Sequence, residues 1–334
     1  MLTAVTDPQP PIDDFDPAFT ARVTELLERV EERLHEVSAA NTEFVTEASR
    51  HIVNAGGKRF RPLLVVLAGL ISPNLDEDAA IRAAVVMELT HVASLYHDDV
   101  MDEAELRRGA PSANNRWGNT VAILVGDYLF SRASRIVAGL GPDFVELQAD
   151  TFSRLVQGQI AETVGPADGE DPLQHYLNVV ADKTGSLIAA STAFGGMVSS
   201  LPAGQLRALT AFGEEIGVVF QLSDDLLDIE SDTSGKTPGT DLRAGVPTLP
   251  TLLARESKDP ADARLLELLD SDLSDDADLA EALRLMRAHS SLAKARAEVN
   301  RRAEVARSYL APLPEGSAKQ ALSALCDQVI GRSV

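Results

Sequence analysis

Apolar residues recur at helical spacing along almost the whole chain, and this limits the possible folds more than any other feature. Asp16 can cap a first helix that begins at Pro17, and its apolar stripe is formed by Val23, Leu26, Leu27, Val30 and Leu34. The same spacing predicts helices over residues 62–71, 76–106, 116–139, 143–164, 172–200, 203–230, 259–270, 276–288, 290–311 and 316–331. No segment alternates apolar and polar residues over the length of a strand. We therefore predict an all-α fold.

The composition agrees with a helical core. Hydrophobic residues make up 45% of the chain but aromatic residues only 4%, so the core must be largely aliphatic. Strands are enriched in aromatic and β-branched residues, and this composition therefore favours helices over a β-sandwich. The chain has no internal repeat of short period, which argues against a solenoid. We therefore predict a single-domain bundle of about ten or more helices.

Two segments depart from the helical pattern. Residues 1–15 are rich in proline and acidic residues and are predicted to be a disordered tail, which leaves residues 16–334 as one catalytic domain. Residues 231–250 are rich in glycine and proline. A loop of this length inside a compact helical domain is typical of a lid or a binding loop.

Charge and cysteine content exclude several classes of protein. The net charge of −21 argues against a nucleic-acid partner and against adhesion to anionic lipid. A single cysteine, Cys326, allows no internal disulfide and fits a reducing cytoplasm. The N-terminus lacks the features of a signal peptide. No apolar run approaches the ~18 residues of a membrane span, so we expect a cytoplasmic protein without a stable membrane anchor.

Two acidic clusters share one spacing. Asp98, Asp99 and Asp102 form the first, and Asp224, Asp225 and Asp228 form the second, each after an apolar helical run. Carboxylates at positions i and i+4 lie on one helix face and repel each other unless a cation intervenes. Oxygen ligands without a His or Cys pattern suit Mg²⁺. The alternative for one cluster is a solvated acidic patch, but the repetition of the spacing argues against it.

Cationic and polar residues accompany these clusters. They include Lys58, Arg59 and Arg61 after two glycines, Arg107 and Arg108 just after the first acidic cluster, and also His91, Lys183, Thr184 and Lys236. In an acidic protein, such groups are candidates for holding a diphosphate. Each taken alone is equally compatible with a helix C-terminal cation, a core histidine or a surface lysine.

In this order, the motifs resemble those of the trans-isoprenyl diphosphate synthases of the polyprenyl synthetase family. The resemblance covers the chain from about residue 20 and rests on Gly56–Pro62, Asp98–Gly109, Lys183-Thr184, Phe220–Asp228 and Gly235-Lys236. It implies the isoprenoid synthase type of fold, with a central apolar cavity. It also implies a homodimer and about three Mg²⁺ ions.

The resemblance assigns roles to individual residues. Metal binding falls to Asp98, Asp102 and Asp224, with support from Asp99, Asp225 and Asp228. The allylic diphosphate, such as farnesyl or geranylgeranyl diphosphate, would contact Arg107, Lys183 and Lys236. Isopentenyl diphosphate would contact Lys58, Arg61, His91 and Arg108, and the reacting centre would be lined by Thr184 and Gln221. Val246 stands where many relatives carry a lysine, which puts one phosphate contact in doubt.

The implied reaction is head-to-tail condensation of isopentenyl diphosphate with an allylic carbocation, in a cavity that excludes water. Short-product relatives often place bulky aromatics at the positions of Ala93 and Ser94. Small residues there predict an open tunnel, with its floor near Met87 or Phe152, and a long all-trans product suited to a quinone side chain.

Other functions remain to be weighed. A short-chain farnesyl or geranylgeranyl diphosphate synthase would use the same chemistry. A terpene cyclase would not need the cations that are predicted to bind isopentenyl diphosphate. A regulatory subunit of a heteromeric synthase tends to lose its acidic clusters, and a structural scaffold has no reason to duplicate them.

Overall fold

The computed structural model describes residues 15–230 and 238–331, and the chain divides into two compact units. The first unit comprises Met1–Ser153, Leu187–Thr210 and Pro312–Leu322, and the second comprises Arg154–Ser186, Ala211–Ala311 and Ser323–Val334. Helices dominate both units, which confirms the all-α prediction. The single catalytic domain over residues 16–334 and the central cavity stay predictions. Of the predicted tail, residues 1–14 lie outside the described part of the chain.

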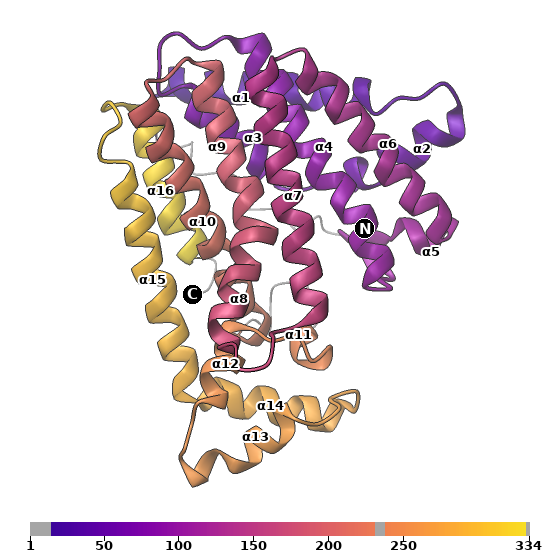
Figure 1. The fold of residues 1–334 in the computed structure, drawn as a ribbon, viewed down its shortest axis with the longest axis vertical. Coiled ribbons are helices and arrows are strands. Elements are labelled where there is room, and N and C mark those ends of the chain that lie inside the picture. Colours follow the sequence, from indigo (N-terminus) through magenta and orange to yellow (C-terminus); the bar gives the residue numbers. More distant parts are fainter. Residues whose placement is uncertain (1–14, 231–237, 332–334) are drawn as a thin grey trace. The chain divides into compact units, whose positions relative to one another are not determined.

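The first unit is built around one long buried helix (Figure 1). This helix, α4, is Glu77–Met101, and it contacts α1 (Pro17–Val37), α3 (Phe60–Gly69), α5 (Ala113–Trp117) and α6 (Asn119–Ala138). Asp76 caps α4 by accepting a hydrogen bond from the backbone N–H of Ala79, and two acidic residues follow in its first turn. By length and hydropathy α4 could span a membrane, but 83% of its most apolar window is buried inside the protein, as in a core helix.

Close backbone packing joins two further parts of the first unit. Helix α9 is Ser186–Val198, and a Cβ atom at its Gly195 would lie 2.3 Å from the carbonyl oxygen of Val65 on α3. No side chain fits at that distance, so the sequence needs glycine there for the two helices to touch. Helix α2 (Glu43–Asn54) also belongs to the first unit, where it contacts α1, α5 and α6. The sequence analysis did not predict α2, because half of its buried face is the small residues Ala48 and Ser49.

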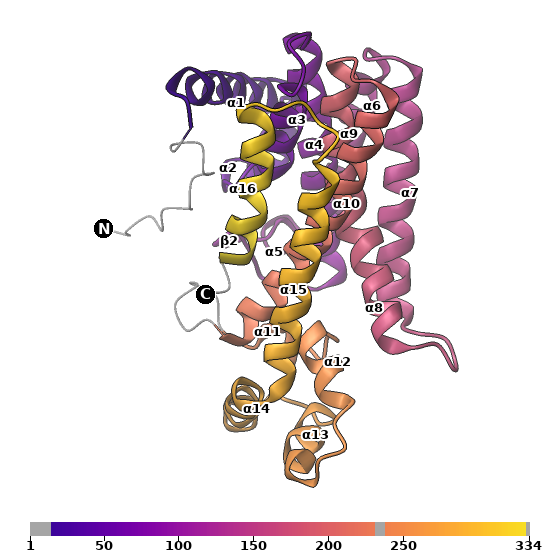
Figure 2. The same ribbon diagram turned by 90° about the vertical axis from the view of Figure 1, so that its left-hand side faces the viewer.

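The second unit contains α8, α15 and several short helices. They are α8 (Pro172–Val180), α11 (Thr240–Arg243), α12 (Leu249–Arg255), α13 (Ala263–Leu269), α14 (Asp276–Ala288) and α15 (Ser290–Tyr309). Figure 2 shows α13 and α14 beside the N-terminal end of α15, and α12 contacts all three. Three further helices contribute residues to both units: α7 (Pro142–Val164), α10 (Ala203–Glu230) and α16 (Ser317–Gly331).

Three predictions differ from the structure in detail. Helix α4 ends at Met101 instead of residue 106, because the chain turns back there and Leu106–Arg107 (β1) pairs with Ala110–Pro111 (β2). The predicted helix over 172–200 contains a π-helical turn, η1, at Ala181–Gly185. The predicted loop over 231–250 holds α11 and the start of α12 among its described residues.

Candidate functional site

The turn between α2 and α3 brings arginines together in the first unit. Burial and the neighbouring Arg108 lower the pKa of Arg61 to about 10, although the charge of Glu88 works against this shift. The Nε atom of Arg61 is buried and has no hydrogen-bond partner among the described residues. A guanidinium with a buried, unsatisfied N–H donor is suited to bind an anion.

His91 lies on α4 within reach of the same charges. Burial lowers its pKa well below the usual value, and the nearby Arg61, Arg108, Arg107 and Arg59 lower it further. His91 is therefore neutral near pH 7 and can serve as a hydrogen-bonding group without adding charge. The structure thus gathers Arg61, His91 and Arg108, three of the four residues predicted to bind isopentenyl diphosphate. The fourth, Lys58, is exposed on the adjoining turn.

The first acidic cluster closes the C-terminal end of α4, and its three aspartates have different surroundings. Asp99 is fully buried, and both Nε and Nη2 of Arg107 lie 2.6 Å from its Oδ1 atom. Its other oxygen, Oδ2, is buried and has no hydrogen-bond partner in the part of the chain that the structure describes. Asp98 is half-buried and Asp102 is exposed at the helix C-cap, one turn further on. Asp98 and Asp102 can therefore meet a ligand from one side, whereas Asp99 orients Arg107.

The π-helical turn η1 in the second unit carries Lys183 and Thr184. Three residues of α7 at positions i, i+4 and i+8 face this turn. Arg154 contacts Asp182 at 2.8 Å, and Glu162 pairs with the Lys183 ammonium. Between them, a Cβ atom at Gly158 would lie 2.7 Å from the backbone nitrogen of Lys183. Single π-helical turns inside helical segments are frequent at functional sites. These contacts with α7 stabilise the π-helical turn, which is a less stable geometry than an α-helix.

The second acidic cluster lies on α10 and is joined to η1 by a chain of hydrogen bonds. Thr184 Oγ1 donates to Gln221 Oε1 at 3.3 Å, and Gln221 Nε2 donates to Asp225 Oδ1 at 3.3 Å. Asp225 also accepts from the Tyr176 hydroxyl and, at 3.2 Å, from the backbone N–H of Leu249. Burial raises the pKa of Asp225 to about 7, although these hydrogen bonds oppose the shift.

The outer aspartates of this cluster also differ from each other. Asp224 is half-buried on α10. The carboxylate of Asp228 accepts the backbone N–H groups of Thr240 and Asp241, each at 3.1 Å, at the start of α11. Asp228 therefore fixes the chain where it returns after residues 231–237. Lys236, which was predicted to bind the allylic diphosphate, lies outside the described residues, and Val246 is exposed.

The donor set fits a divalent cation that is shared with a phosphate. Across residues 15–230 and 238–331, no three His, Cys, Asp or Glu side chains lie together in a group that could hold a metal unaided. Mg²⁺ in phosphate-handling enzymes usually takes one or two carboxylates and completes its shell with water and substrate phosphates. The pair Asp98 and Asp102 and the single Asp224 meet that requirement, and the Oδ2 atom of Asp99, which has no partner among the described residues, can accept a hydrogen bond from a metal-bound water beside the pair.

The positions predicted to set product length lie on α4. Ala93 is fully buried and Ser94 nearly so, and the Ser94 hydroxyl donates to the His91 carbonyl at 2.8 Å. Met87, one candidate for the tunnel floor, is also fully buried. The other, Phe152, packs against Phe130 of α6, with ring centroids 4.3 Å apart. Sequence reasoning missed Phe130, because its contact depends on how α6 and α7 pack.

Other residues of the site were also missed. Glu88 is a carboxylate buried in the apolar stretch of α4, and that isolated charge was a signal in the sequence. Glu31 and Tyr176 gave no local signal, since their partners are 28 and 49 residues away.

A mainly helical chain with two such aspartate clusters and a group of arginines fits a class of protein that binds diphosphates through divalent cations. The polyprenyl synthetase family matches residues 42–286, more than half of the chain. A nonaprenyl diphosphate synthase of Mycobacterium tuberculosis is 48% identical over 96% of both chains.

Solved structures agree with this match. A geranylgeranyl pyrophosphate synthase from Corynebacterium glutamicum, complexed with calcium and isoprenyl diphosphate, has a TM-score of 0.86 and 42% identity and covers 95% of this chain and 98% of its own. A decaprenyl diphosphate synthase from Rhodobacter capsulatus has a TM-score of 0.85 and 31% identity and covers 97% and 100%. The chain belongs to the polyprenyl synthetase family, and it is a prenyltransferase.

Proposed function

We propose that the chain condenses isopentenyl diphosphate head to tail with an allylic diphosphate and releases a long-chain all-trans polyprenyl diphosphate. The observation that carries this proposal is the pair of aspartate clusters, in each of which the middle carboxylate is held by protein groups. Asp98, Asp102 and Asp224 would then hold about three Mg²⁺ ions together with the substrate phosphates. When bound, these ions stabilise the negative charge that develops on the leaving diphosphate.

Substrate binding and the lining of the reacting centre are assigned to residues of the chain itself. Arg61, Arg108, neutral His91 and Lys58 bind isopentenyl diphosphate, and Arg107 and Lys183 bind the allylic diphosphate with Lys236. Thr184 and Gln221, joined by a hydrogen bond, lie beside the reacting carbon. Apolar walls keep water from the allylic cation. We assign the final proton to the released diphosphate.

A long product is supported by two observations. Ala93 and Ser94 are small, and both are buried in α4. The relative with 48% identity is named for a nonaprenyl product. A geranylgeranyl product is the second candidate, since a structure with 42% identity carries that name. We place the enzyme in the cytoplasm and assign its product to a quinone side chain.

We also propose a homodimer. Val156, Ile160 and Val164 recur at i, i+4 and i+8 on α7 and are 38%, 56% and 77% exposed. An exposed apolar stripe of this kind is typical of a protein interface.

The assay that tests the function uses the purified chain, labelled isopentenyl diphosphate and a panel of allylic starters, with and without Mg²⁺. We expect metal-dependent polyprenyl diphosphates of about seven to ten isoprene units, each unit extending roughly one helical turn of 5.4 Å. Products that stop at three or four units would favour the short-chain alternative. No product from any starter would favour a regulatory subunit.

Substitution of Ala93 tests the tunnel. Ala93→Phe, or the milder Ala93→Leu, should shorten the product because the side chain would occupy the channel. Ala84 is equally buried and lies nine residues away, on the opposite face of α4, so Ala84→Phe is the matched control for overpacking. An unchanged product length in both Ala93 variants would refute the tunnel assignment.

A further inference from the structure

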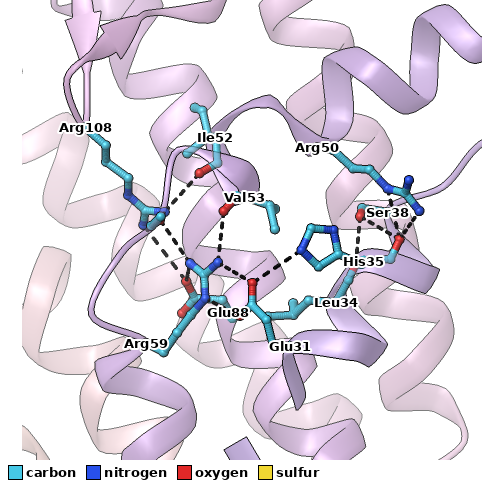
Figure 3. Close-up of polar contacts among 11 residues, drawn as sticks. Glu31, Leu34, His35, Ser38, Arg50, Ile52, Val53, Arg59, Glu88 and Arg108 are labelled. Atoms are coloured by element: carbon cyan, nitrogen blue, oxygen red, sulfur yellow. Dashed lines mark hydrogen bonds and ion pairs between the residues drawn. The ribbon is translucent and has the colours of Figure 1, made fainter. Parts of the chain in front are cut away.

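Arg59 lies between Lys58 and Arg61, yet its guanidinium points into the protein (Figure 3). It makes a two-pronged contact with Glu31, in which Nε and Nη2 donate to the two carboxylate oxygens at 2.7 and 2.9 Å. Nη2 also donates to the carbonyl of Val53 at 2.9 Å, and Nη1 donates to the carbonyl of Gly56 and to Glu88, both at 3.1 Å. A guanidinium has five N–H donors, and these five bonds use them all. Arg59 therefore has no donor left for a ligand.

Glu88 connects this arginine to a second one. Its carboxylate is 2% exposed and lies 4.0 Å from Nη2 of Arg108. Nη1 of Arg108 donates to the carbonyls of Ile52, at 3.1 Å, and of Gly56. Arg59 and Arg108 thus share one carboxylate and one backbone carbonyl. A buried carboxylate is costly without such partners, so the arginines and Glu88 hold one another in place.

The turn that they hold has an unusual backbone. Arg59 has a φ of 48°, in the left-handed region that residues with a Cβ atom seldom adopt, and Gly56 and Gly57 have φ values of 92° and 135°. A Cβ atom at Gly57 would lie 2.7 Å from the Arg108 guanidinium. Strained backbone of this kind persists only where its surroundings fix it, and it is common at ligand-binding sites.

We propose that Glu31, Arg59 and Glu88 form a positioning device that fixes the turn of residues 55–61 and so presents Lys58 and Arg61 to the diphosphate of the non-allylic substrate. This inference rests on the proposed function. The three residues do not touch the substrate; they act through the turn and through Arg108. Because the turn is ordered before the substrate arrives, binding does not have to supply the free energy of ordering it.

Two variants test the device. Arg59→Lys keeps the charge, but lysine has three donors on one nitrogen and cannot span both glutamates. Glu88→Gln keeps the shape and removes the negative charge. In both, we expect the KM for isopentenyl diphosphate to rise about 10- to 100-fold, the range expected when charge-assisted hydrogen bonds to the diphosphate are weakened. The KM for the allylic diphosphate and kcat should stay within about twofold of wild type, since uniform binding energy alone is lost.

A double variant shows whether Arg59 and Glu31 act as one unit or whether each substitution weakens substrate binding independently. Arg59→Lys with Glu31→Gln should raise the KM no further than Arg59→Lys alone, because residues that act as one unit are not additive. Arg33→Lys is the matched control: Arg33 lies on the same helix as Glu31 and forms an exposed pair with Glu36. It should leave the KM of both substrates unchanged.

Several results would overturn the proposal. They are an unchanged KM for isopentenyl diphosphate, a parallel rise for both substrates, or additive effects in the double variant. Thermal melting of each variant identifies loss of fold, and Glu31→Gln alone, which keeps the Glu88 contacts, then provides the milder test. A wild-type chain without condensation activity would refute the proposed function instead. In that case calorimetry with inorganic diphosphate decides: equal affinity of wild type and Arg59→Lys would refute the positioning device.

Discussion

The two aspartate clusters have the same spacing but different surroundings. At the end of α4, the middle carboxylate, Asp99, is bound by a cation, with two Arg107 nitrogens at 2.6 Å. On α10, the middle carboxylate, Asp225, accepts from neutral donors among the residues that the structure describes, which are the Tyr176 hydroxyl, the Gln221 amide and the Leu249 N–H group. Each middle aspartate is therefore held by other protein groups, and within residues 15–230 and 238–331 the ion pair is found at Asp99 and not at Asp225.

The last aspartate of each cluster differs as well. Asp102 is exposed at the C-cap of α4, whereas the Asp228 carboxylate accepts two backbone N–H groups of α11. We therefore expect Asp102 to contribute to cation binding and Asp228 mainly to support α11. Identical motif letters do not imply identical ligand sets, because the neighbouring elements decide which oxygens are available.

The largest effect is expected at the outer aspartates. Asp98→Ala and Asp224→Ala should each lower kcat by about 10³-fold or more, since a bound cation contributes several kcal/mol to the transition state. Asp228→Ala should cost less, because that carboxylate supports α11. Steady-state rates at saturating Mg²⁺ measure this, with the exposed Asp150→Ala as control. Equal losses in Asp224→Ala and Asp228→Ala would remove the distinction between these two positions.

The next largest difference in kcat is expected between substitutions of two glycines, Gly158, which packs against η1, and Gly126, which packs against His97. A Cβ atom at Gly158 meets the backbone nitrogen of Lys183, so Gly158→Ala must shift η1 and should lower kcat about 10- to 100-fold. The three atoms nearest to a Cβ atom at Gly126 all belong to the imidazole of His97, which can rotate away. Gly126→Ala should therefore cost less. Gly204 has no atom within 4 Å of such a Cβ, and Gly204→Ala is the control. A larger loss in Gly126→Ala than in Gly158→Ala would contradict this order.

The two middle aspartates, Asp99 and Asp225, should differ in how much each contributes to the free energy of unfolding. Asp99→Asn leaves Arg107 without its anion and should lower the free energy of unfolding by about 2 kcal/mol, a value reduced by the partial exposure of that arginine. Burial raises the pKa of both carboxyl groups, so the difference comes from the arginine that Asp99→Asn leaves unpaired. Asp225→Asn leaves no such cation behind among the described residues and should cost less than about 1 kcal/mol. Urea unfolding in a metal chelator gives both values. Equal losses would mean that the ion pair is no stronger than the neutral contacts.

A similarly small effect is expected at Tyr176. Tyr176→Phe removes one neutral donor to Asp225 and should lower the free energy of unfolding by about 1 kcal/mol. The same urea experiment measures it. A loss greater than that of Asp99→Asn would reverse the comparison between the clusters.

The sequence predicted the parts of the site that helix geometry controls. Asp98 and Asp102 share a face because they are four residues apart on one helix, and the same holds for Asp224 and Asp228. The partners of the middle aspartates were not predictable, since Tyr176 is 49 residues from Asp225 and meets it only through packing. The π-helical turn at Lys183 was missed for a similar reason: residues of α7 hold it, and no local pattern encodes it.

The most direct test of this account is anomalous diffraction from crystals that contain Mn²⁺ in place of Mg²⁺ and an unreactive allylic diphosphate analogue. The account predicts metal peaks beside Asp98 and Asp102 and beside Asp224, with Asp99 still paired with Arg107 and Asp225 still bound to Tyr176. A metal ion coordinated directly by Asp99 or Asp225, or no metal at either cluster, would contradict it.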